Sequence, residues 1–190
     1  MSNFEFVFSL LVILLGLGLG QVLGGLASSV KRRPELEIGW GTGLLATWVM
    51  TETVIFWQII WRTRDVMPDD IPALFAGLGI TALYYFAGAL VFPDGLANRK
   101  SLDDYFMVTK AKVIGAIIAA FTIAFLLRPL VLGFVSWSFL NWFDWVAMGI
   151  IYLAGGVVMF TKRRGVAVGG LAVLVALDLF TPFGYVLLGE

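Results

Sequence analysis

FEFVFSLLVILLGLGLGQVLGGLA, at residues 4–27, contains one charged residue, Glu5, and is otherwise almost entirely apolar. A transmembrane α-helix needs about 20 consecutive, mainly apolar residues to cross the hydrocarbon core of a bilayer. The run is long enough, and a basic cluster at residues 31–33 follows it. We therefore predict a transmembrane helix over residues 4–27.

The rest of the chain has the same character. Of its 190 residues, 60% are hydrophobic and only 14% are charged, whereas about 25% charged residues is usual in soluble domains. A soluble domain of this size leaves much of its surface in water, so lipid must surround most of these side chains. The sequence predicts an all-α fold, a single membrane domain over residues 1–190, with six transmembrane helices over residues 4–27, 40–61, 72–92, 102–127, 143–160 and 165–188.

A shorter apolar segment, residues 129–142, separates the fourth and fifth predicted helices and is rich in Trp and Phe. Segments of this length and composition are typical of interfacial or re-entrant helices. With six spans, ten of the 13 basic residues fall on one side: Lys31, Arg32, Arg33, Arg99, Lys100, Lys110, Lys112, Lys162, Arg163 and Arg164. The positive-inside rule makes that side cytoplasmic and puts both termini on the other side. Lys110 and Lys112 are expected to snorkel towards the headgroups.

Two missing residue types limit the chemistry. The chain has no Cys and no His, which excludes thiolate catalysis and removes the usual haem ligand, the commonest metal ligand and the usual general base. The sequence therefore predicts neither an enzyme nor a cofactor or metal site. The net charge is zero and no long basic block occurs, so no nucleic-acid partner is expected.

Glu52 and Asp178 are the two acidic residues that fall in the middle of predicted helices. An ionisable group at that depth costs at least about 2.5–3.5 kcal/mol and usually marks a pathway or a polar partner. No Lys or Arg lies at the same depth, so burial favours the protonated forms. Trp48 and Phe56 lie one turn either side of Glu52. We predict that these acids line an ion or proton pathway; the alternative is that each is a neutral acid with a structural hydrogen bond.

Pro182 lies four residues after Asp178. Proline has no N–H, so the backbone carbonyl of Asp178 loses its helix hydrogen bond and a kink is expected. Thr181 and Tyr185 fall near the same helix face, and Thr51 adds a hydroxyl beside Glu52. Broken helices with freed carbonyls form cation sites in many transporters. The alternative is a packing kink whose carbonyl is satisfied by Thr181 or by water.

Two further patterns have structural alternatives. Gly16, Gly20 and Gly24 make a stripe of small residues on the first helix, which favours close helix packing or an intersubunit surface. The aromatic residues 84–86 are compatible with a hydrophobic ligand such as a quinone or carotenoid, but aromatic clusters more often belong to a core.

The segments YYFAGALVFP (residues 84–93) and LDDYF (residues 102–106) resemble a stretch of small, uncharacterised bacterial membrane proteins. The resemblance implies a bacterial inner-membrane location and no particular chemistry. Two functional hypotheses follow. One is a proton- or cation-coupled transporter or channel that uses mid-membrane carboxylates. The other is a non-catalytic accessory or scaffold subunit of a larger membrane complex. Expected partners are the lipid bilayer, protons or monovalent cations, and a second copy or a membrane-complex partner.

Overall fold

The structure is a computed structural model that describes residues 3–32, 37, 39–65, 71–94, 101–132 and 142–188. Within these ranges it does not describe the side chains of residues 3, 4, 6, 128–132, 142–144 and 181–188. The regular secondary structure of the described part is helical, apart from an isolated β-bridge between Glu37 and Ser101. The helices are α1 (Asn3–Lys31), α2 (Trp40–Arg62), α3 (Ile71–Val91), α4 (Asp103–Leu132), α5 (Trp142–Phe160) and α6 (Arg164–Leu188).

The all-α class is confirmed, and the helix bounds agree closely with the predicted ranges. Four helices, α1 to α4, are long and apolar enough to cross a membrane; the described apolar part of α5, Trp145–Phe160, is shorter. Six spans therefore stay a prediction. The predicted interfacial segment is partly corrected, because α4 continues through Pro129 to Leu132. Residues 133–141 lie outside the described part.

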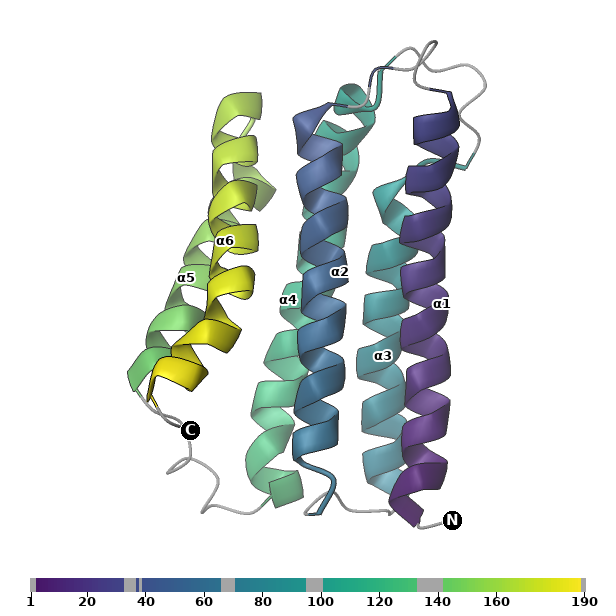
Figure 1. The fold of residues 1–190 in the computed structure, drawn as a ribbon, viewed down its shortest axis with the longest axis vertical. Helices are drawn as coiled ribbons and strands as arrows, with labels where there is room; N and C mark the ends of the chain where they lie inside the picture. Colours follow the sequence, from purple (N-terminus) through teal and green to yellow (C-terminus); the bar gives the residue numbers. More distant parts are fainter. Residues whose placement is uncertain are drawn as a thin grey trace.

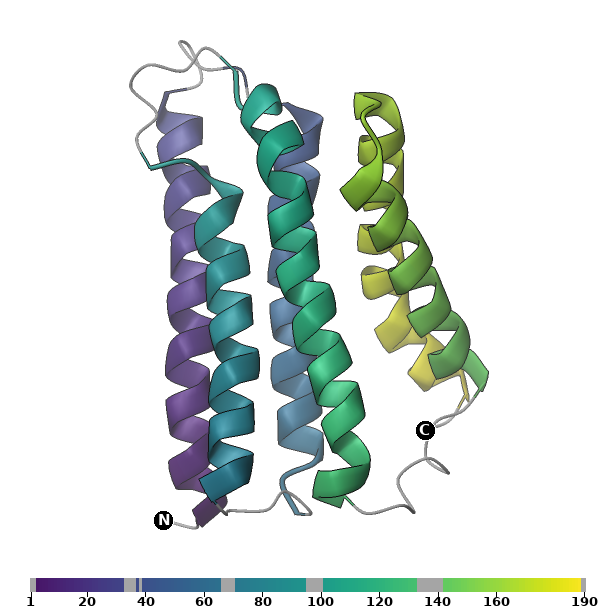
Figure 2. The same ribbon diagram turned by 180° about the vertical axis from the view of Figure 1, so that it is seen from behind.

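The six helices form two layers of three (Figures 1 and 2). One layer holds α1, α2 and α6, and the other holds α3, α4 and α5. Helix α2 is central and contacts α1, α3, α4 and α6. Residues near the middle of α2 are therefore the best placed to meet side chains from both layers.

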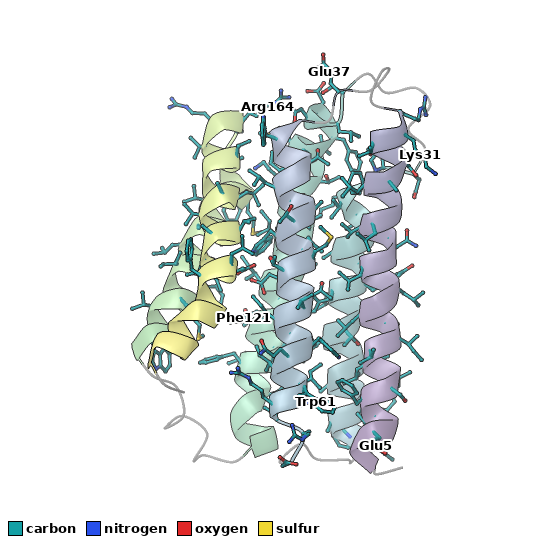
Figure 3. All side chains as sticks on the ribbon, viewed as in Figure 1. Glu5, Lys31, Glu37, Trp61, Phe121 and Arg164 are labelled. Carbon is teal, nitrogen blue, oxygen red and sulfur yellow. The ribbon has the colours of Figure 1, made fainter. Side chains whose placement is uncertain are left out.

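The helices alternate in direction. Lys31 and Arg164 are at one end of the bundle, and Glu5 and Trp61 are at the other (Figure 3). Helix α1 begins, and α6 ends, towards the same end of the bundle (Figure 1). This up-and-down arrangement is the one that short connections between antiparallel helices produce.

The outside of the bundle is apolar, as lipid requires. Exposed large side chains are spread over the helices and include Ile13, Phe75, Phe86, Val108, Leu126, Leu153 and Phe160. The buried side chains, by contrast, include two carboxylic acids, a lysine and several threonines: Glu52, Asp178, Lys110, Thr42, Thr53, Thr81 and Thr109. Polar groups inside and apolar groups outside are the distribution expected when the surrounding solvent is hydrocarbon.

Most of the threonines are satisfied within their own helix. Thr47 donates to the carbonyl oxygen of Gly43 at 3.0 Å, and Thr53 donates to that of Val49 at 2.7 Å. This back-bonding neutralises a hydroxyl inside a membrane helix and needs no partner from another helix.

The glycines that pack α1 are not the predicted ones. Gly16, Gly20 and Gly24 are exposed, and a methyl group at any of them would meet nothing within 4 Å. As an intramolecular packing stripe the prediction is wrong; an intersubunit surface stays a prediction. The close contact with α3 is made by Gly18, whose carbonyl oxygen would lie 2.6 Å from a methyl group at Gly88.

Replacing Gly88 by Ala should therefore destabilise the bundle by about 1–3 kcal/mol, the usual cost of overpacking, because the obstacle is backbone and cannot rotate away. The matched control is Gly20→Ala, where the methyl group meets nothing and helix propensity favours Ala by about 1 kcal/mol. Thermal unfolding of both variants in detergent measures the difference. Equal melting temperatures for the two variants would contradict the close α1–α3 contact.

Candidate functional site

Glu52 and Asp178 lie against each other in the interior of the bundle. Glu52 is on α2 and 3% exposed; Asp178 is on α6 and 4% exposed. The two helices pack side by side, and the two carboxyl groups come within hydrogen-bonding range. Two carboxylates that share a buried site repel each other strongly, so the pair is most stable when it holds a proton between its oxygens.

The hydroxyl group of Thr51 is the second polar group that α2 contributes to this site. Thr51 Oγ1 lies 2.7 Å from Asp178 Oδ2 and 3.0 Å from the backbone carbonyl oxygen of Trp48. A hydroxyl has one hydrogen to donate and lone pairs that accept. It can therefore donate to an ionised Asp178, or donate to the Trp48 carbonyl and accept from a protonated Asp178, without moving its oxygen atom.

Trp48 lies one turn before Glu52 and is completely buried. Its indole lies close enough to the Glu52 carboxyl group to act on it as a donor, but its Nε1–H makes no hydrogen bond of normal length and angle. Among buried side-chain nitrogen and oxygen atoms of the described residues, only this nitrogen and Asp103 Oδ1 have no hydrogen-bond partner. An unused donor beside two acids is unusual, because buried polar groups are normally paired.

Helix α3 closes the site with Tyr84. Its ring is buried and stacks on Phe56 of α2, with 4.8 Å between the ring centroids. The Tyr84 phenol lies within electrostatic range of both carboxyl groups. Tyr84 is thus part of the core, which was the alternative to a hydrophobic-ligand site for residues 84–86. The neighbouring Phe86 is exposed.

No cation of the described residues neutralises the pair. The groups that act on the two carboxyls are each other, Trp48 and Thr51. Arg164 forms ion pairs with Asp103 and Asp104, both at 3.1 Å.

Lys110 is also engaged elsewhere, and its position corrects a prediction. The expectation that it snorkels is wrong: Lys110 is 2% exposed. Its Nζ donates to the backbone carbonyl oxygens of Val158, Met159 (3.2 Å) and Thr161 (2.8 Å). These carbonyls end α5 and have no helical partner of their own, so Lys110 caps the C-terminus of α5, where a positive charge is favoured. Lys112, in contrast, is exposed.

The remaining predicted site residues are only partly visible. Helix α6 includes Thr181, Pro182 and Tyr185, so Pro182 does not end the helix, but the three side chains lie outside the described part. The structure therefore brings together Glu52, Asp178 and Thr51 from the predicted set.

The sequence did not predict the contacts that Trp48, Tyr84 and Lys110 make. The i−4 spacing puts Trp48 on the Glu52 helix face, but it does not indicate an indole donor beside the acid. The positions of Tyr84 and Lys110 depend on how α3, α4 and α5 pack, which the sequence pattern does not specify. No group of three or more acids among the described residues is suited to hold a metal ion.

Comparison with known proteins gives no match: no family model, no curated protein and no solved structure is significantly similar to this chain. The resemblance to small bacterial membrane proteins therefore stays a prediction, and the geometry of the site is what bears on function.

Proposed function

We propose that the protein is a proton- or cation-coupled transporter or channel whose ion-binding site is the Glu52–Asp178 pair. The observation that carries the proposal is the contact between two buried acids of different helices without a neutralising Lys or Arg among the described residues. Maintaining such a pair in hydrocarbon is costly. A cation that binds between the two acids offsets this cost, and its release gives the site a second state.

The hydroxyl of Thr51 favours reversible binding when the cation is a proton. When Asp178 is ionised, Thr51 donates to Oδ2; when Asp178 is protonated, Thr51 can accept from it and donate to the Trp48 carbonyl. Asp178 is then hydrogen-bonded to Thr51 in both protonation states, so neither state is strongly favoured over the other by this contact. Groups in proton relays inside membranes have this property of being satisfied in either state.

The proposal places all six helices across a bacterial inner membrane, with both termini on the periplasmic side. Ten of the 13 basic residues then belong to the cytoplasmic end of the bundle or its connections, as the positive-inside rule requires. Helices α5 and α6 lie alongside α4 and α2 in the same bundle (Figures 1 and 2). A membrane that surrounds α2 and α4 therefore surrounds α5 and α6 as well.

The test is infrared difference spectroscopy on the protein in lipid, combined with ion flux in proteoliposomes. Raising the pH should remove a buried carboxylic acid band in wild type, and this change should be lost or altered in Glu52→Gln and in Asp178→Asn. Asp94→Asn, which neutralises an exposed acid just after α3, is the matched control and should behave as wild type. Proton or Na⁺ flux should exceed that of empty vesicles.

A spectrum without any titrating band that depends on Glu52 or Asp178 would overturn the proposal. So would a wild-type flux equal to that of empty vesicles together with equal flux in both variants. The two readouts are independent, because the band reports binding and the flux reports movement across the bilayer.

A second function, an accessory subunit of a larger membrane complex, is favoured by one observation. Gly16, Gly20 and Gly24 form a smooth, exposed ridge on α1 that no described part of the chain covers. Small residues of this spacing let another helix approach closely. Purification under native conditions tests this function: a stoichiometric partner that Gly20→Leu releases would support it, and a monomer would exclude it.

A further inference from the structure

The unused hydrogen-bond donor of Trp48 bears on which cation the acid pair holds. Hard cations, unlike transition metals, are held in proteins by oxygen ligands that donate electron pairs, and magnesium and calcium take six or more of them. Indole Nε1–H can only donate a hydrogen. A donor beside Glu52 therefore competes with a metal for the same carboxylate lone pairs. The partial positive charge on its hydrogen also repels the metal cation.

Few side-chain oxygens of the described residues are available to a metal. They are those of the two carboxyl groups and Thr51 Oγ1, while the hydroxyls of Thr47 and Thr53 are committed to their own helix. No third acid joins the pair among the described residues. A proton needs only two oxygens, one on each side, and the carboxyl pair provides them.

We infer that the Glu52–Asp178 pair binds a proton and excludes alkali-metal cations, with the Trp48 indole N–H as the selecting group. The inference rests on the proposed function and specifies its ion. When the pair holds the proton, Glu52 and Asp178 share it. When the proton leaves, a carboxylate oxygen of Glu52 becomes free to accept from Trp48 Nε1–H, so the indole stabilises the deprotonated pair without a metal.

The other groups around the pair are compatible with this assignment. From α6 the facing acid is Asp178 itself, and from α3 the facing titratable group is Tyr84. On α4, Lys110 is bound to the end of α5, and Asp103 and Asp104 pair with Arg164. The charged residues of α1, Glu5 and Lys31, lie at its two ends. The proton equilibrium of the pair is thus governed by the four groups Glu52, Asp178, Thr51 and Trp48, with Tyr84 nearby.

The experiment follows the indole N–H signals of the seven Trp residues by NMR in nanodiscs, using protein labelled with ¹⁵N-Trp. Trp48→Phe identifies the Trp48 signal by its disappearance, and Trp57→Phe, an exposed position on the same helix, is the control for the assignment. The pH is then varied in NaCl, in KCl and in choline chloride at equal ionic strength. The infrared band of the carboxyl pair is recorded in the same buffers.

The expected result is that the Trp48 signal and the infrared band share one pH midpoint, identical in all three salts, and that the Trp48 signal does not titrate in Glu52→Gln. A cation that competes with the proton would move the midpoint by up to about one pH unit for each tenfold rise in its concentration. A midpoint in NaCl or KCl that differs from the one in choline overturns the inference and leaves the proposed function standing.

A Trp48 signal that does not titrate while the infrared band does would also overturn the inference, because the indole would then play no part in binding. Absence of titration in both readouts is a different outcome. It would remove the proposed function itself, so the two failures are distinguishable.

Discussion

Glu52→Gln is expected to lower proton flux on the order of 100-fold, the loss usual when a positioned acid–base group is removed. Gln preserves the length and the hydrogen-bonding capacity of Glu52, and its amide can still bond to Asp178. The variant should therefore fold with nearly the wild-type melting temperature, while the pair loses its ability to hold and release a proton. Flux in proteoliposomes with an internal pH dye measures the effect.

The pair makes a sharper prediction for the double variant. If both carboxyls hold one proton between them, Asp178→Asn alone costs about as much as Glu52→Gln, and the two together cost no more than either. Groups that act as a unit are non-additive in this way. Losses that multiply in the double variant would instead mean that the two acids act independently. Asp94→Asn again serves as the control.

Lys110→Met is expected to produce the largest loss of stability. Lys110 donates to three carbonyl oxygens at the end of α5, and Met fills a similar volume but leaves all three without their donor. A hydrogen bond to a charged group is worth about 1.5–3 kcal/mol, and an unsatisfied buried acceptor costs a further penalty. We expect a decrease of about 3 kcal/mol or more in the free energy of unfolding.

Lys112→Met is the matched control, because Lys112 lies two positions further along α4 and is exposed. It removes the same charge without removing a buried contact. Reversible unfolding in mixed micelles compares the two variants. If both lose the same small amount of stability, Lys110 does not cap α5.

The fold could be predicted from the sequence because hydrocarbon imposes a simple rule. Each apolar run has to form a helix in order to satisfy its backbone, so the run lengths specified the helices, and charged or proline-containing connections specified their ends. The predicted end of the fourth helix was wrong, because the helix continues beyond a proline. Pro129 did not end α4, because the rest of the helix can support one missing hydrogen bond.

The acids themselves could be identified from their depth, but their contact could not. The hydrogen bond from Thr51 to Asp178 joins residues 127 positions apart, and it exists because α6 packs against α2 as well as against its neighbour in the chain, α5. Glycine spacing was a weaker guide: Gly16, Gly20 and Gly24 have the expected periodicity, yet Gly18 makes the contact with α3. Spacing identifies a smooth face of a helix but does not say which neighbour meets it.

Helices α5 and α6, which are synthesised after α2 and α4, supply the partners of two buried groups on those earlier helices. Glu52 meets Asp178 of α6, and Lys110 meets the end of α5. Until α5 and α6 are synthesised, Glu52 and Lys110 therefore lack these partners. We expect a chain truncated before α5 to be less stable in the membrane than the chain of 190 residues, because both groups would remain buried without them.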